Sequence, residues 1–131
     1  MPESTENTDL LIEKKTLVIG ASLKPHRFSN TVIRRLCEHH IPVVAVGLRE
    51  GVVNDVTIFK PFPEVSNIHT VSLYVGPRNQ PFWYDFILQA NPRRVIFNPG
   101  TENEDFQQVL RERDIEVVTG CTLVMLSNDE Y

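Results

Sequence analysis

The chain has 131 residues, of which 41% are hydrophobic and 23% are charged; this composition is typical of one folded globular domain and excludes a disordered or fibrous protein. Its formal net charge of −4 at pH 7 argues against a general nucleic-acid-binding surface, which needs clustered Lys and Arg. No apolar stretch is long enough to span a membrane. Residues 1–13 are polar and acidic, the reverse of a secretory signal. We therefore expect a cytoplasmic protein with a flexible tail over residues 1–13 and one domain over residues 14–131.

From Thr16 onward, short runs rich in β-branched residues alternate with longer amphipathic segments. Thr16–Gly20 reads as a buried strand, and a loop leads to a helix over residues 29–39 with Ser29 as its N-cap. Residues 42–46 form a second buried strand that ends at Gly47. The apolar residues of the helix recur at helical spacing and predict its buried face: Phe28, Val32, Ile33, Leu36 and Cys37.

The second half of the chain continues the alternation after an irregular stretch over residues 47–69, in which Val56–Phe59 is a candidate extra or edge strand. The third main strand is Thr70–Val75. A helix over 79–90 follows, with Pro81 in its first turn; its predicted buried stripe is Phe82, Trp83, Phe86, Ile87 and Ala90.

Two strands and two helices complete the predicted domain. Residues 94–98 form strand four, and the capping-box spacing of Thr101 and Glu104 predicts the start of a helix. Residues 115–118 form strand five, and 121–126 form a short last helix. Strands that are continuous apolar runs alternate with helices, and this pattern predicts an α/β domain with a parallel sheet covered on both faces. We expect a doubly wound, Rossmann-like, parallel five-stranded sheet in the order 3-2-1-4-5, with helices on both faces.

The loop after the first strand is the strongest candidate for a binding site, because ligands of such sheets lie at the carboxyl ends of the strands. Gly20, Ala21 and Ser22 turn the chain toward a helix N-terminus, which favours anions through its free N–H groups and its dipole. Lys24 and Arg27 could neutralise phosphates there. The alternative interpretation is a tight turn with two solvated cations.

The loop is not the dinucleotide fingerprint GxGxxG, because no second or third glycine follows Gly20 at that spacing. After the second strand, a site for an unphosphorylated dinucleotide would place an acidic residue that binds the ribose diol. This chain has Arg49, which suits a phosphorylated ribose such as that of coenzyme A or NADP. The alternative interpretation of Arg49 is an exposed loop charge.

The sequence contains no recognisable catalytic or metal-binding motif. GxSxG is absent, and the histidines and cysteines form neither an HExxH nor a CxxC pattern. We therefore predict no metal site and no catalytic residues, and we keep His26 as a minor ligand candidate. Cys37 is expected in the core. Cys121, at a predicted helix start where a thiol pKa is lowered, is either a buried apolar residue or a reactive thiol.

Four segments in this order resemble the CoA-binding domain family, the small single-domain relatives of the CoA-binding domain of the succinyl-CoA synthetase alpha subunit. The resemblance runs from about Thr16 to the C-terminus, and the second domain that carries the synthetase's phosphohistidine is lacking. The segments are Val18-Ile19-Gly20-Ala21-Ser22, Arg27-Phe28-Ser29-Asn30, Asn98-Pro99-Gly100-Thr101-Glu102-Asn103-Glu104 and Gly120-Cys121-Thr122-Leu123-Val124.

The resemblance implies that coenzyme A binds with its phosphates near Gly20, Ser22 and Arg27, its adenine near residues 46–49, and its remainder near residues 75–78 and 99–100. Together with the loop analysis it gives the predicted cofactor-binding residues: Gly20, Ala21, Ser22, Lys24, Arg27, Ser29, Gly47, Arg49, Val75, Gly76, Pro99 and Gly100.

The predicted function is non-catalytic binding of coenzyme A or an acyl-CoA by this single domain, with no nucleic-acid or membrane partner. The alternative is a reductase-class enzyme that uses NADP. A further reading has Cys121 forming a mixed disulfide with coenzyme A. The aromatic segment 82–84 is a candidate homodimer contact, although such residues more often belong to a core.

Overall fold

The computed structural model describes residues 14–131, so the tail predicted over residues 1–13 lies outside the described residues. Its sheet has seven strands in the order β3-β4-β2-β1-β5-β6-β7. Every neighbouring pair is parallel except β3–β4, which is antiparallel. The strands are β1 (Thr16–Ile19), β2 (Val43–Val46), β3 (Gly51–Val53), β4 (Val56–Phe59), β5 (Thr70–Leu73), β6 (Arg94–Phe97) and β7 (Glu116–Thr119).

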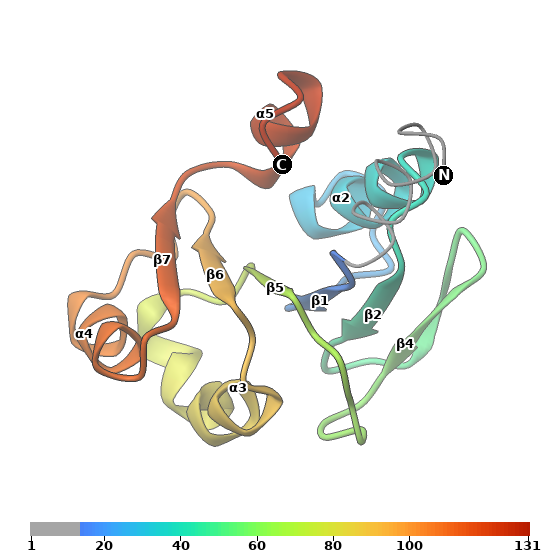
Figure 1. Ribbon diagram of the computed structural model, residues 1–131. Coiled ribbons are helices and arrows are strands. Elements are labelled where there is room, and N and C mark those ends of the chain that lie inside the picture. Colours follow the sequence, from blue (N-terminus) through green and yellow to red (C-terminus); the bar gives the residue numbers. More distant parts are fainter. Residues whose placement is uncertain (1–13) are drawn as a thin grey trace.

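Helices cover both faces of this sheet, as expected for a doubly wound α/β domain. Figure 1 shows α2 (Phe28–Glu38) and α5 (Thr122–Ser127) on one face, with α3 (Tyr84–Ala90) and α4 (Glu104–Glu112) on the other. The 3₁₀ helix η1 (Pro77–Trp83) precedes α3. No helix within residues 14–131 combines the length and the apolar character needed to cross a membrane.

Alternate residues of each strand supply two hydrophobic cores. Leu17 and Ile19 of β1 belong to the core beneath α3 and α4, whereas Val18, between them, belongs to the core beneath α2 and α5. All three side chains are fully buried. This burial on both sides explains why the strands appear in the sequence as continuous apolar runs rather than as alternating ones.

The prediction of a parallel α/β sheet is confirmed, but the prediction of five strands in the order 3-2-1-4-5 is wrong. That order would place Thr70–Leu73 beyond β2, whereas this strand pairs with β1 on the opposite side. The place beside β2 is taken by β4, the candidate extra strand, with β3 outside it. A short hairpin over residues 51–59 therefore occupies the edge beside β2, where this fold usually has a strand reached through a crossover helix.

The chain then crosses from β4 to β5 without a helix. Residues 60–69 contain no regular element, yet Val65 and Ile68 pack into the core beneath α3 and α4. This segment covers part of the face that a crossover helix normally covers.

Three predicted helix starts were wrong, for local reasons. Ser29 lies in the first turn of α2 and is buried, while Arg27 takes the N-cap position without a side-chain cap. The N-cap of α4 is Asn103, whose side chain accepts from the N–H of Phe106 at 3.2 Å. Thr101 instead donates its hydroxyl to the carbonyl oxygen of Asn98 at 2.7 Å. The predicted helix over 79–90 is the pair η1 and α3, because two prolines, at 77 and 81, remove N–H donors from its start.

Candidate functional site

A cavity of about 1200 Å³ opens at the carboxyl ends of β1, β2, β5 and β6, which is where ligands of such sheets lie. The structure brings all twelve predicted cofactor-binding residues to it. The full lining is Gly20, Ala21, Ser22, Leu23, Lys24, Arg27, Phe28, Ser29, Gly47, Leu48, Arg49, Tyr74, Val75, Gly76, Arg78, Asn79, Pro81, Phe82, Trp83, Pro99, Gly100 and Thr101.

The loops after β1 and β2 are locked together at one wall of the cavity. The N–H groups of Gly20 and Ala21 both donate to the carbonyl oxygen of Val46, each at 3.0 Å. Gly20 has a φ of 89°, which favours glycine. At Gly47 a Cβ atom would lie 2.3 Å from the carbonyl oxygen of Ala21. The two glycines thus allow the backbones of the loops after β1 and β2 to approach each other closely. The N–H groups of residues 20 and 21 already donate within the protein and are not available to a ligand.

The first turn of α2 presents N–H groups to the same wall. An α-helix leaves its first N–H groups without intrahelical partners, and α2 has no side-chain cap. Asn30 fixes the preceding loop to this helix: its side-chain amide donates to the carbonyl oxygen of Ser22 at 2.9 Å. The anion site predicted for the loop from Gly20 to Ser29 stays a prediction, in which the N–H groups of residues 20 and 21 are not available as donors.

Four cationic side chains and no carboxylate, histidine or thiol line the cavity within residues 14–131. The cations are Lys24 and Arg27 before α2, Arg49 after β2, and Arg78 in η1. All four are exposed, and none forms an ion pair with a carboxylate of the described residues. In a protein of net charge −4, this cavity is a local concentration of positive charge, which attracts anionic ligands.

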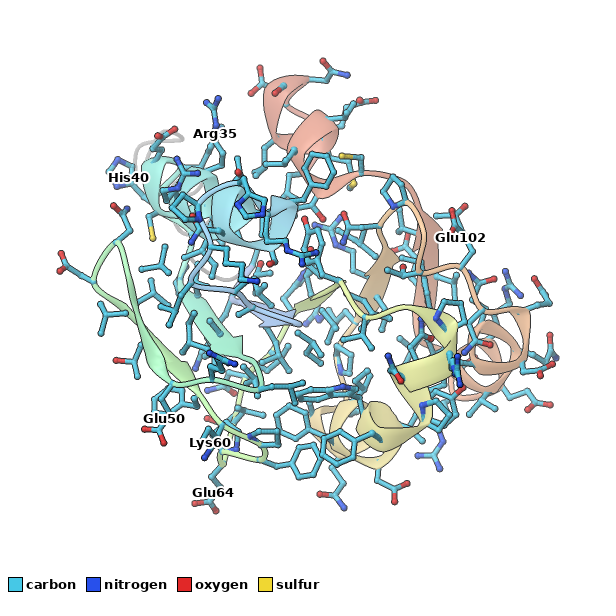
Figure 2. All side chains as sticks on the ribbon, turned by 180° about the vertical axis from the view of Figure 1, so that it is seen from behind. Arg35, His40, Glu50, Lys60, Glu64 and Glu102 are labelled. Carbon is cyan, nitrogen blue, oxygen red and sulfur yellow. The ribbon has the colours of Figure 1, made fainter. Side chains whose placement is uncertain are left out.

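The acidic residues nearest these loops in sequence are directed elsewhere. Figure 2 shows Glu50 and Glu102 on opposite sides of the molecule, each projecting outward. Glu102 accepts a hydrogen bond from the N–H of Gly100 at 2.9 Å and so closes its own turn. The positive charge of the lining is therefore not neutralised by these carboxylates.

The opposite wall, formed after β5 and β6, is held by Gln80, which is fully buried. Its amide nitrogen donates to the carbonyl oxygens of Val75 at 2.8 Å and Thr101 at 2.6 Å. Its amide oxygen accepts from the side chain of Asn103 at 2.9 Å. One side chain thus joins the two loops of this wall. Sequence analysis did not single out Gln80, because a polar residue in the first turn of a predicted helix carries no marker of burial.

The cavity also has large apolar side chains at its rim, which sequence analysis missed. Phe28, Leu48 and Phe82 line it with 73%, 72% and 59% of their surface exposed. Phe28 and Phe82 were predicted to be buried in helix faces. Of the aromatic segment 82–84, only Phe82 is exposed, since Trp83 is buried and Tyr84 is half-buried against Phe106.

Tyr74 lies at the floor of the cavity with its hydroxyl buried. Burial raises the pKa of Tyr74 to about 12, opposed in part by the hydroxyls of Ser72 and Thr122. Those two hydroxyls hydrogen bond each other at 2.8 Å, and within residues 14–131 the Tyr74 hydroxyl completes no hydrogen bond. Tyr74 is therefore a neutral phenol at every physiological pH.

The remaining sequence candidates lie outside the lining. His26 is exposed beside the cavity, and Cys121 is half-buried at the N-cap position of α5. Cys37 is also half-buried rather than in the core, and both thiols are free. No group of three His, Cys, Asp or Glu side chains among the described residues could hold a metal ion. The mixed disulfide at Cys121 stays a prediction.

One comparison with known proteins names a family, and another finds solved structures that are similar to this chain. The model of the family described as "CoA binding domain" matches residues 14–127. A crystal structure of an uncharacterised protein is 44% identical, with a TM-score of 0.87, and the match covers 90% of this chain and 98% of that one. A search of curated proteins finds no match.

Two further structures share the fold at lower identity. The structure named ID.343 from Thermus thermophilus is 20% identical with a TM-score of 0.79, and the match covers 100% of both chains. A hypothetical protein from Pyrococcus horikoshii OT3 is 23% identical with a TM-score of 0.77, covering 95% of this chain and 89% of that one.

Proposed function

Because the chain belongs to the CoA-binding domain family, we propose that it binds coenzyme A or an acyl-CoA in the cavity at the carboxyl ends of β1, β2, β5 and β6, without catalysing a reaction. The observation that carries this proposal is the lining, which within residues 14–131 has four cations without an ion-pair partner and no carboxylate. Coenzyme A presents a pyrophosphate and a 3′-phosphate, so its charge matches such a lining.

The charges also orient the ligand. Lys24, Arg27 and the first turn of α2 would hold the pyrophosphate, and Arg49 would pair with the 3′-phosphate. The exposed apolar side chains of Phe28 and Leu48 would then contact the adenine ring. The pantetheine arm would run toward Tyr74, Gly76 and Pro99 at the opposite wall, where the lining is mostly uncharged.

The absence of catalysis is part of the proposal and is supported by the same lining. Within the described residues, the lining holds no carboxylate, histidine or thiol, and the phenol of Tyr74, with a pKa of about 12, stays protonated. A general base works best with a pKa near the ambient pH.

Isothermal titration of the purified chain with coenzyme A, ADP, NAD and NADP tests the proposal. We expect coenzyme A to bind most tightly, and Arg27→Ala to weaken it roughly tenfold or more, since a charge-assisted hydrogen bond contributes about 1.5–3 kcal/mol. Arg35→Ala is the matched control: Arg35 lies on the same helix and makes only an exposed ion pair with Glu38. Preferential binding of NADP would favour the reductase alternative, and no binding of coenzyme A at millimolar concentration would refute the proposal.

A further inference from the structure

The two walls of the cavity differ in chemistry. Three of its four cations, Lys24, Arg27 and Arg49, lie on the loops after β1 and β2, whereas η1 contributes Pro81, Phe82 and Trp83 to the opposite wall. A ligand with a polyanionic nucleotide at one end is therefore oriented with its other end toward η1. For coenzyme A, that other end carries the sulfur atom.

The wall formed by η1 is an aromatic surface with one exposed ring open to the cavity. Phe62, from the β4–β5 crossover, packs against Phe82 at 5.1 Å between ring centroids, against Trp83 at 5.5 Å and against Phe86 at 5.2 Å. Trp83 is 3% exposed and Phe86 is 8% exposed, whereas Phe82 is 59% exposed and Phe62 is 49% exposed. Of the two exposed rings, Phe82 lines the cavity and Phe62 lies outside its lining. The cluster thus holds Phe82 in place from behind while much of its side chain remains accessible at the cavity.

This arrangement suits an apolar group. A large aromatic side chain exposed to water contributes little to folding, whereas burial of its surface by an apolar ligand is favourable. The open ring is at the end of the cavity that the sulfur would reach, and apolar rings there offer a thiol little specific recognition. A thioester carrying a hydrocarbon chain would bury both its own surface and that of Phe82.

We propose that Phe82, supported by Phe62 and Trp83, forms an acyl subsite, and that the protein selects thioesters with an apolar acyl group over free coenzyme A. This proposal rests on the proposed function, because the nucleotide must first be held by the cations of the opposite wall. It names the ligand class: acyl-CoA esters of medium-chain or aromatic acids.

Arg78 supplies the obvious competing chemistry, since this exposed cation belongs to η1 and lines the same cavity. An acyl group with a terminal carboxylate could pair with it. Hexanoyl-CoA and succinyl-CoA are therefore the two informative thioesters, because they share the nucleotide and differ in whether the acyl chain ends in a methyl group or a carboxylate.

Titration calorimetry on the whole chain should give hexanoyl-CoA an affinity at least about tenfold above that of coenzyme A, as expected for burying several methylene groups. Phe82→Ala should reduce this preference to about twofold, because hexanoyl-CoA loses more affinity than coenzyme A does. Phe59→Ala is the control, because Phe59 is 45% exposed on β4 and does not line the cavity.

The intrinsic fluorescence of the wild-type protein provides a second readout that needs no variant. Trp83 is the single tryptophan and its ring lies 5.3 Å from that of Phe82. Hexanoyl-CoA should shift or quench its emission more than coenzyme A does at equal saturation.

Three results would overturn the proposal. Equal affinity for coenzyme A and hexanoyl-CoA would show that there is no acyl subsite, and it would leave the proposed function unaffected. Tighter binding of succinyl-CoA than of hexanoyl-CoA assigns that end of the cavity to Arg78. A dimer in analytical ultracentrifugation that Phe82→Ala converts to a monomer assigns the open ring to contact with a second copy. Failure of every CoA compound to bind would instead refute the proposed function.

Discussion

Gln80 illustrates how a single buried side chain can determine the shape of a binding wall. It provides the hydrogen bonds for two loop carbonyls, those of Val75 and Thr101, and for the side-chain amide of Asn103. The bond to the Thr101 carbonyl is buried and the bond to the Val75 carbonyl is partly buried, so losing Gln80 would leave these acceptors short of a partner. The Asn103 amide also donates to the hydroxyl of Tyr84 at 2.8 Å and depends on Gln80 less.

Gln80→Leu, which keeps the volume but removes the polar atoms, should therefore destabilise the fold by about 1–3 kcal/mol for each group left unpaired. Equilibrium unfolding in urea measures this loss as a lower midpoint. Gln89→Leu is the matched control, since Gln89 is exposed on α3. Equal midpoints for the two variants would show that the hydrogen bonds of Gln80 contribute nothing to stability.

Residue-scale roles were the part of the site least accessible from sequence. The twelve predicted residues all line the cavity because their positions follow from where strands end, and strand ends are visible as glycine and proline after apolar runs. Gln80 and Asn30 have no such marker, because their importance arises from carbonyl groups that only the folded chain brings within reach. Phe28 and Phe82 were misassigned because helical spacing alone does not distinguish a core from a cavity rim.

At the scale of elements, the start of α2 is positioned by its preceding loop. Asn30 is buried, donates to the carbonyl oxygen of Ser22 and accepts from the side chain of Arg34 at 3.0 Å. The loop and the helix therefore present Lys24 and Arg27 from a fixed base.

In Asn30→Ala, the loop should lose this attachment, and ligand binding would have to order it again. We expect coenzyme A to bind roughly threefold to tenfold more weakly, since immobilising one side chain costs about 0.5–1.5 kcal/mol. Calorimetric titration measures the change, with Cys37→Ala near the far end of the same helix as control. An unchanged affinity would mean that the loop is held without Asn30.

The elements themselves were predicted with uneven success. Strands were found because β-branched runs buried on both faces are distinctive. Helix starts were less well predicted: Ser29 has the right chemistry for an N-cap, but it is buried within the first turn, two residues after the N-cap Arg27. The strand β3 was missed because its three residues, Gly51–Val53, are too few to show a period.

At the scale of the whole molecule, acid sensitivity should originate at the end of the sheet opposite the cavity. Burial, followed by the positive charges of Arg94, Lys14 and Arg93, lowers the pKa of His69. Its Nδ1 lies 2.7 Å from the hydroxyl of Thr70, which accepts a hydrogen bond from Arg94 at 2.8 Å. A neutral ring with an unprotonated Nδ1 can accept the hydroxyl proton of Thr70, which agrees with the lowered pKa of His69.

A histidine held neutral contributes stability that is complete above its unfolded pKa of about 6.5 and is lost as the pH falls toward its lower folded value. The free energy of unfolding should therefore decrease below about pH 6.5, and His69→Gln should flatten this dependence. Urea titrations between pH 7 and pH 5 measure it, with His40→Gln, an exposed position, as control. A steeper slope in His69→Gln would contradict the assignment.

Topology was the other whole-molecule feature that the sequence only partly revealed. Alternation correctly predicted a mostly parallel sheet, but it could not show on which side of β1 the strand at residues 70–73 lies. That choice depends on the hairpin β3–β4 occupying the edge beside β2. The net charge likewise did not reveal the positive charge of the cavity, because four cations line it although the chain as a whole is acidic.

The hydrogen bonds of Gln80 have a consequence for ligand binding. They join the loops after β5 and β6 to each other, as the backbone contacts of Gly20, Ala21 and Gly47 join the loops after β1 and β2. The two pairs of loops meet between β1 and β5, where the strand order reverses. A ligand that crosses this boundary would contact two linked pairs of loops rather than four separate loops.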